Sequence, residues 1–287
     1  MNLHHTPFIQ KQFSGTNLQG EPSVFTVVKA SYDFNDKGEL RIADEQEAIV
    51  THDQFYQRPK DSSIRYAEES MPFKKGGELL VMGTLQPRAD HARQQTLTMK
   101  LKQHNTDWQK SLTVFGKRYW YTTLMGAKIT EPLPLSEPIE LRYELAFGAQ
   151  AYPANPTGKG FTDKRFKVND LELPQIEYTR ALIRSPRSRP YVAGFNAIPK
   201  HWQPRLQTDL HSTDRHNLAP LDQQFSNPFQ GDEVLQITGW TTTVLSQKPL
   251  TLSIPQALKY NDEVLTWDTI TINMDTQKIY LFTRLQS

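Results

Sequence analysis

The stretch EPIELRYELAFGAQAYPANPTGKGF, residues 137–161, contains a strand pattern followed by a loop pattern. Over residues 139–144 apolar and charged side chains alternate, which is the period-two pattern of a half-buried strand. From Ala146 onward the alternation stops, and beyond Ala149 two prolines and two glycines mark a turn-rich loop. A long loop that follows a strand is either functional or an ordered connection, so we expect this stretch to lie near the structural centre.

Strand patterns recur through the rest of the chain. They cover residues 24–34, 39–42, 79–83, 96–102, 111–115, 234–237, 240–244, 250–254, 264–267, 269–273 and 279–283, the last two as a hairpin. The chain also contains 19 prolines and 14 glycines, and few long helical patterns. We therefore predict a mainly β fold of antiparallel, sandwich-like sheets with long proline-rich loops, few short helices and no helix longer than about 15 residues.

The length favours one large unit. We interpret residues 1–287 as a single β-rich domain. An alternative is that this domain consists of two packed lobes that meet near residues 125–137. Residues 1–21 show no strand or helix period, and we expect an irregular arm that Phe8 and Phe13 anchor to the body.

Composition argues against several classes of protein. The formal net charge is +2, from 33 basic and 31 acidic residues, which disfavours a nucleic-acid binder driven by phosphate neutralisation. No apolar run approaches the roughly 20 residues of a membrane helix, and the N-terminus lacks a signal-peptide pattern. There is no cysteine, which fits a reducing compartment and excludes a thiolate metal site. We expect a cytoplasmic protein without a membrane partner.

A series of short motifs runs in order along the chain. It includes VVKA at 27–30, SSIRY at 62–66, MPFKKGGELLVMG at 71–83, GKRYW at 116–120, YELAFG at 143–148, NPTGKGF at 155–161, SPRSRP at 185–190 and AGF at 193–195. In this order the motifs resemble a bacterial family of type VI secretion effector adaptors, from about Val27 to Arg284. Ala149 stands where that family usually has a second glycine, which indicates a backbone conformation open to other residues.

The resemblance implies a function and two partners. Such adaptors are not enzymes; they bind a toxic effector, often near its N-terminal or proline-alanine-alanine-arginine-repeat region. They then help to load it onto the valine-glycine-repeat (VgrG) spike of the secretion apparatus. From the resemblance we expect an effector protein and VgrG as partners, and no cofactor. The effector's identity and the oligomeric state are left open.

The residues themselves offer few catalytic patterns. Asp209, His211, Asp214 and His216 lie close together in a polar segment, but their spacing matches no known zinc pattern, so we expect a solvated loop and no metal. Glu140 and Glu144 would share the solvent face of one strand. The alternative to an adaptor is a β-sandwich hydrolase or carbohydrate-active enzyme whose acids lie in loops.

Arginines and aromatic residues gather in the loops, and both types are enriched at the anchors of protein interfaces. The candidate partner-binding residues are Phe147, Tyr152, Phe161, Arg187, Arg189, Tyr191 and Trp202. The opposing interpretation is that the arginines form internal salt bridges and the aromatic rings belong to the core. We expect residues 147–161 and 185–202 to form one contiguous region on the central sheet, because aperiodic segments need a partner surface to become ordered.

Overall fold

The computed structural model describes residues 7–17, 21–88, 92–103, 106–163, 168–203, 205–207, 216–240, 249–256, 259–260 and 263–286. The fold is mainly β, as predicted, and its described helical segments include three single turns of 3-10 helix. These are η1 (Tyr143–Leu145), η2 (Arg205–Gln207) and η4 (Leu221–Gln223). None of the described helices is long and apolar enough to span a membrane.

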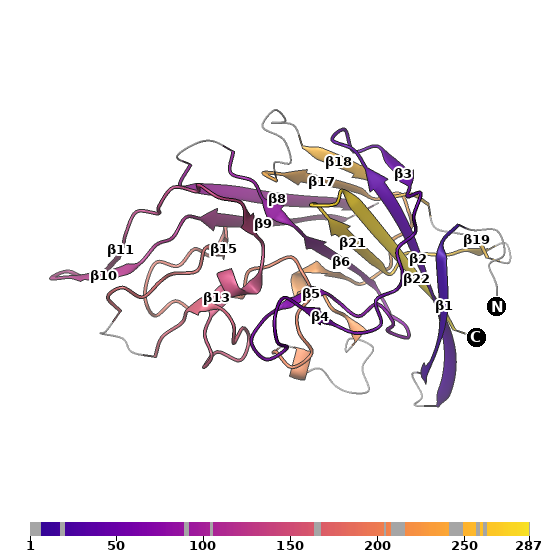
Figure 1. Cartoon of the computed structure of the whole chain (residues 1–287), viewed down its shortest axis with the longest axis horizontal. Helices are drawn as coiled ribbons and strands as arrows, with labels where there is room; N and C mark the ends of the chain where they lie inside the picture. The colour runs from indigo at the N-terminus through magenta and orange to yellow at the C-terminus, as the bar shows by residue number, and fades with distance from the viewer. Residues whose placement is uncertain are drawn as a thin grey trace.

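Two sheets form the body of the molecule (Figure 1). The seven-stranded sheet runs in the order β1 (Ile9–Thr16), β2 (Pro22–Phe34), β22 (Lys278–Gln286), β21 (Thr269–Asn273), β6 (Gly77–Met82) and β16 (Gln224–Phe225), and β3 (Leu40–Ile42) also pairs with β2. The five-stranded sheet runs in the order β15 (Ile176–Tyr178), β9 (Thr106–Phe115), β8 (Gln94–Gln103), β17 (Val234–Thr238) and β18 (Leu250–Ser253). Every pair is antiparallel except the parallel pair β6–β21.

Five two-stranded units lie outside these sheets. They are β4 (Gln54–Phe55) with β5 (Ile64–Tyr66), β7 (Thr84–Leu85) with β12 (Ile139–Glu140), β10 (Trp120–Thr123) with β11 (Gly126–Ile129), β13 (Phe147–Gly148) with β14 (Lys159–Gly160), and β19 (Lys259–Tyr260) with β20 (Glu263–Val264). The hairpin β10–β11 extends from the end of the molecule opposite the two termini (Figure 1). Residues 125–137, where two lobes would meet, carry part of this hairpin and its connection to β12.

One main core lies between the two sheets. Leu97, Met99 and Leu101 of β8 are buried and alternate with more exposed residues, so one face of the five-stranded sheet packs inward and the other faces solvent. Val28 of β2 and Leu281 of β22 belong to the same core cluster. Because residues from both halves of the chain share this cluster, the sheets form one sandwich.

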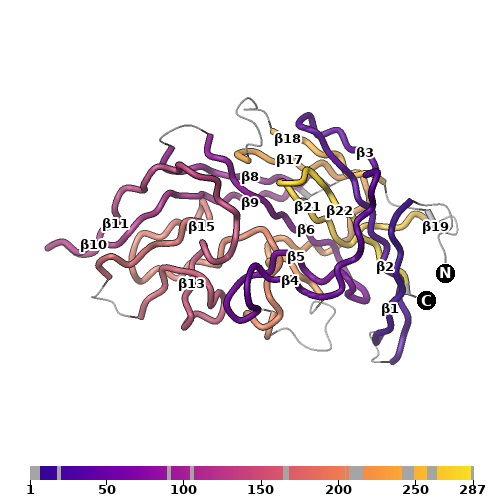
Figure 2. Tube along the Cα trace, viewed as in Figure 1, coloured from indigo at the N-terminus to yellow at the C-terminus, as the bar shows by residue number. Residues whose placement is uncertain are grey.

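The seven-stranded sheet is buried on its second face as well. Val27 and Phe282 point away from the main core into a separate cluster with Ile49, and Leu80 of β6 packs with Leu218. Loop segments cover this face, and they are here called the covering loops: residues 43–76, 195–198 and 216–220, which contribute Ile49, Ile64, Ala67, Ala197, Leu218 and Ala219 to the two clusters. In Figure 2 the described chain between about residues 140 and 225, in pink and orange, lies below β8 and β9.

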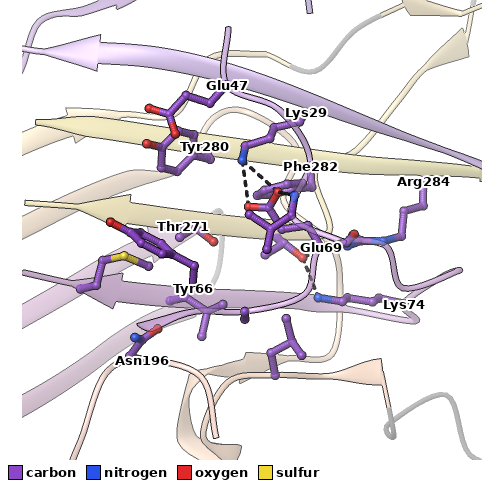
Figure 3. A pocket seen from close by; sticks show the side chains of 16 residues that line it. Lys29, Glu47, Tyr66, Glu69, Lys74, Asn196, Thr271, Tyr280, Phe282 and Arg284 are labelled. Carbon is purple, nitrogen blue, oxygen red and sulfur yellow. Dashed lines mark hydrogen bonds and ion pairs between the residues drawn. The ribbon is translucent and has the colours of Figure 1, made fainter. Parts of the chain in front are cut away.

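Buried charges attach the first covering loop to this sheet (Figure 3). Lys29 Nζ of β2 donates to both carboxylate oxygens of Glu69 at 2.9 Å and to the carbonyl of Ala48 at 3.1 Å. Arg284 of β22 pairs with Asp268 and donates to the Glu69 carbonyl at 2.9 Å. These side chains border an internal cavity of about 50 Å³. The strand-borne cations therefore hold the loop by its backbone and by its carboxylate.

Two predictions of secondary structure were wrong. The arm is not irregular over residues 9–16: it forms β1, which pairs with β2 in register Ile9↔Lys29, while Phe8 is buried and Phe13 stacks on Phe25. The strand predicted over 139–144 ends at Glu140, because Tyr143–Leu145 turns into η1. Glu144 is not a solvent-face residue; its carboxylate accepts from the backbone N–H and hydroxyl of Ser63 at 2.7 and 2.8 Å.

Three predicted strands differ in smaller ways. The strand expected at 111–115 begins earlier, at Thr106, and residues 104–105 lie outside the described residues. Of the strand expected at 240–244, only Trp240 is described. The strand expected at 264–267 is limited to β20 at 263–264, and Trp267 forms a separate bridge with Phe229.

Replacing Lys29 with methionine tests the attachment of the covering loop. We expect Lys29→Met to lower the free energy of unfolding at pH 7 by about 3–5 kcal/mol, because Glu69 is left buried without its cation. The double variant Lys29→Met/Glu69→Gln should recover a large part of this loss. Urea unfolding measures both, with Lys100→Met on the exposed face of β8 as the control. A loss below about 1 kcal/mol would contradict this role.

Candidate functional site: an apolar groove between loops

A groove of about 520 Å³ lies between the loop of residues 147–161, the end of β15, the chain of residues 180–203 and the turn η4. Its apolar lining includes Tyr152, Tyr178, Tyr191, Val192, Ile198 and Leu221. Tyr191 is 86% exposed and Leu221 is 69% exposed, so large apolar surfaces remain accessible at the groove. Concave apolar surfaces with aromatic side chains are typical of sites that bind ligands or peptide segments.

The loop of residues 147–161 forms one wall, and Asn155 holds it closed. The Asn155 side chain is fully buried, and its Nδ2 donates to the carbonyls of Tyr143 at 2.7 Å and Phe147 at 3.2 Å. The Asn155 backbone carbonyl accepts from the N–H of Ala149 at 3.1 Å. Both ends of the loop meet in the short parallel pair β13–β14. A single side chain thus satisfies backbone groups that an irregular loop would otherwise bury without partners.

Close packing around Asn155 explains two glycines of the motif. A Cβ on Gly158 would lie 2.4 Å from Asn155 Nδ2, and a Cβ on Gly148 would lie 2.1 Å from the Asn155 carbonyl oxygen. Only glycine allows these approaches without moving the backbone. Ala149 has no positive φ angle, which agrees with the conformation expected there.

The segment 185–203 forms the second wall and contacts the first directly. The N–H of Gln203 donates to the carbonyl of Pro153 at 3.2 Å, and Arg189 Nη2 donates to the carbonyl of Thr162 at 3.0 Å. The hydroxyl of the buried Tyr143 donates to the Asn196 carbonyl at 2.7 Å. The Arg189 guanidinium also lies 4.7 Å from the Phe161 ring centroid, and both ranges line one groove, so the prediction that residues 147–161 and 185–202 form one contiguous region is confirmed. The second range reaches the seven-stranded sheet, where the Phe195 carbonyl accepts from the N–H of Val81 at 3.1 Å, whereas Phe147 of the first range packs in a separate cluster with Trp120.

A charged group lies at the edge of the groove, next to Tyr178. Asp222 accepts from the Tyr178 hydroxyl at 2.9 Å and from Lys110 Nζ at 2.9 Å, and Lys110 also donates to the Gln223 side chain at 2.6 Å. The Lys110 side chain is almost fully buried, and burial lowers its pKa to about 8 against the attraction of Asp222. Burial likewise raises the pKa of Tyr178. Lys110 therefore balances the charge of the carboxylate that lines the groove.

The seven candidate residues divide between groove and interior. Tyr152 and Tyr191 line the groove. Phe147 and Trp202 are buried, and Trp202 packs edge-on against Tyr143 at 5.8 Å, so these two rings are core residues. Phe161 is half-buried and packs against Phe147 and Tyr152.

The two candidate arginines are both exposed but differ in their contacts. The Arg189 guanidinium lies 4.7 Å from the Phe161 ring centroid and donates to the backbone carbonyls of Pro186, Ser188 and Thr162. The Arg187 side chain is exposed, and among the described residues nothing bonds to its guanidinium.

Sequence reasoning missed the rest of the groove. Tyr178, Leu221 and Asp222 line it, but Tyr178 ends a short strand and the other two lie in a polar segment far along the chain. No local pattern connects these positions, because β9 and the turn η4 bring them together. Of the metal candidates, Asp209, His211 and Asp214 lie outside the described residues. His216 is buried against Phe73, with ring centroids 5.3 Å apart.

The fold and groove together define a β-sandwich protein with a preformed apolar site between ordered loops. A family model described as an uncharacterized protein conserved in bacteria (DUF2169) matches residues 19–284. The chain belongs to this family. No curated protein and no solved structure matches the chain.

An isosteric change at Asn155 tests the first wall. We expect Asn155→Asp to lower the free energy of unfolding by about 2–4 kcal/mol at pH 7, because a carboxylate would then face the two carbonyls that now accept from Nδ2. Asn169→Asp is the matched control, since Asn169 uses its Oδ1 to accept from the Thr122 N–H and aspartate keeps that oxygen. Thermal unfolding and limited proteolysis measure both; equal stability of the two variants would contradict the role of Asn155.

The lowered pKa of Lys110 gives a dependence of stability on pH. The pKa is about 8 in the folded chain and 10.5 as its ordinary value, so between these limits the unfolded chain binds more protons. We therefore expect the unfolding free energy of wild type, relative to Lys110→Met, to rise with pH by up to about 1.4 kcal/mol per unit in this window. Urea unfolding at pH 7, 8, 9 and 10 measures the difference. A constant difference up to pH 10 would show that Lys110 stays protonated.

Proposed function

We propose that this chain is a non-enzymatic adaptor that binds a type VI secretion effector in the groove and assists its loading onto the VgrG spike. The observation that carries the proposal is the accessible groove, whose walls are already ordered. Tyrosine and leucine side chains exposed at its opening would become buried on contact with a partner. The motif series supports this class of partner, and the lack of cysteine supports action in the bacterial cytoplasm.

The walls of the groove favour binding without large rearrangement. Proline-rich loops are restricted before a partner arrives, so little conformational entropy is lost on association. The hydrogen bonds of Asn155 fix the first wall, and the bond from the Gln203 N–H to the Pro153 carbonyl joins the two walls. An ordered groove of this kind suits an adaptor that captures an effector segment.

The carboxylates favour this function over the hydrolase alternative. Glu177 pairs with Arg118 and accepts from the Ile183 N–H at 2.7 Å, so its role is structural. Glu78 is fully buried and accepts from the N–H groups of Leu218 and Ala219 at 2.7 and 2.9 Å. Among the described residues that line the groove there is one carboxylate, Asp222, whereas acid–base hydrolysis of a glycoside uses two.

Deleting the gene in the native bacterium tests the function. We expect the cognate effector to disappear from the secreted fraction while other effectors are still released, and the wild-type gene to restore it. Tyr191→Asp should fail to restore secretion and should weaken binding of the purified effector by about tenfold or more, with unchanged melting temperature, because the Tyr191 side chain is exposed.

Val264→Asp is the matched control: it also places a carboxylate at an exposed apolar position, outside the groove lining, and should behave as wild type. Normal secretion of every effector in the deletion strain would refute the adaptor function. Full complementation by Tyr191→Asp would leave the function in place and exclude this groove as the binding site.

A further inference from the structure

One exposed arginine lines the groove, and two more lie on the loop that leads from it to Tyr191. Arg180 lines the groove, and Arg184 and Arg187 lie on the loop between Arg180 and Tyr191, both of which are lining residues. All three arginines are exposed, and within the described part of the chain no carboxylate pairs with any of their guanidinium groups. Exposed arginines beside aromatic side chains are typical anchors of protein interfaces.

Asp222, the one carboxylate among the described residues that line the groove, is already paired: it lies 2.9 Å from Lys110. Elsewhere in the described chain, arginines close to carboxylates do pair with them, as Arg118 does with Glu177 and Arg284 with Asp268. The lining of the groove therefore keeps the charge of Arg180 uncompensated, next to a surface that is otherwise apolar.

We propose that the groove binds an acidic, apolar segment of its partner: a stretch of chain whose aliphatic or aromatic side chains are flanked by aspartate or glutamate. This inference rests on the proposed function and names the chemistry of the segment that the groove accepts. The apolar side chains fill the space between Tyr152, Tyr191 and Leu221, and the carboxylates face Arg180. Electrostatic complementarity of this kind selects the partner and speeds the encounter.

The first experiment is a selection with the purified full chain. A display library of random linear peptides is selected on wild type and, in parallel, on Arg180→Glu and Arg58→Glu. Arg58 is the matched control because it is exposed, does not line the groove and has no ion pair with a described residue. We expect peptides selected on wild type and on Arg58→Glu to combine apolar residues with an excess of aspartate and glutamate. On Arg180→Glu this acidic excess should disappear.

The second experiment exchanges the charges in solution. A selected peptide is compared with a version that has asparagine and glutamine for its acids, and with one that has lysine. By fluorescence anisotropy, Arg180→Glu should bind the acidic peptide about tenfold more weakly than wild type does, and should bind the lysine version more tightly than wild type does. The affinity of wild type for the acidic peptide should fall with added salt, because the charges are near the surface.

Three results would overturn the inference: selected peptides without an acidic excess, an unchanged preference in Arg180→Glu, or no selected peptide at all. None of these results bears on the adaptor function, because the secretion phenotype of the deletion strain is measured without peptides. Conversely, an acidic preference that depends on Arg180, together with normal secretion in the deletion strain, would support the groove's chemistry and refute the proposed function.

Discussion

Burial of the seven-stranded sheet on both faces is the constraint on which the rest of the structure depends. The five-stranded sheet covers one face, and its own outer face meets solvent. The second face carries apolar residues such as Val27 and Phe282, which exclude water only if something covers them. Irregular loops provide this cover, so the proline-rich segments are a structural layer of the protein.

A layer made of loops must satisfy its own backbone groups, and buried side chains take the place of strand ladders. Gln46 accepts from the Ser31 N–H and donates to the Ser31 carbonyl, both at 2.9 Å, much as a neighbouring strand would. Gln223 donates to the carbonyls of Leu79 and Phe195 at 2.6 and 2.8 Å. Asn155 closes the loop beside the groove by the same means. Polar residues that look solvated in the sequence are therefore fixed points of the fold.

The use of side-chain hydrogen bonds in place of strand pairing explains how far the sequence allowed the structure to be predicted. Strands such as residues 22–34 were predictable because β-branched and aromatic residues form the sheet directly. The strand β1 was missed because an edge strand needs less apolar alternation, and its pairing with β2 is a long-range effect. Glu144 was predicted on a solvent face because the alternation in the sequence continues past the point where the chain turns into η1. That turn brings the Glu144 carboxylate to Ser63. Side-chain hydrogen bonds between distant loops leave no period in a sequence.

The same argument separates structural from free residues at the groove. Phe147 and Trp202 have the residue types of interface anchors, but both rings are buried and pack inside the loop region. We selected these buried residues and Tyr191 alike from the sequence, because residue type does not reveal whether a side chain is buried. Tyr191 differs from them because its ring is left in solvent. The exposed part of the groove is thus formed by Tyr191 and Leu221, the lining side chains that the packing of the loops leaves in solvent.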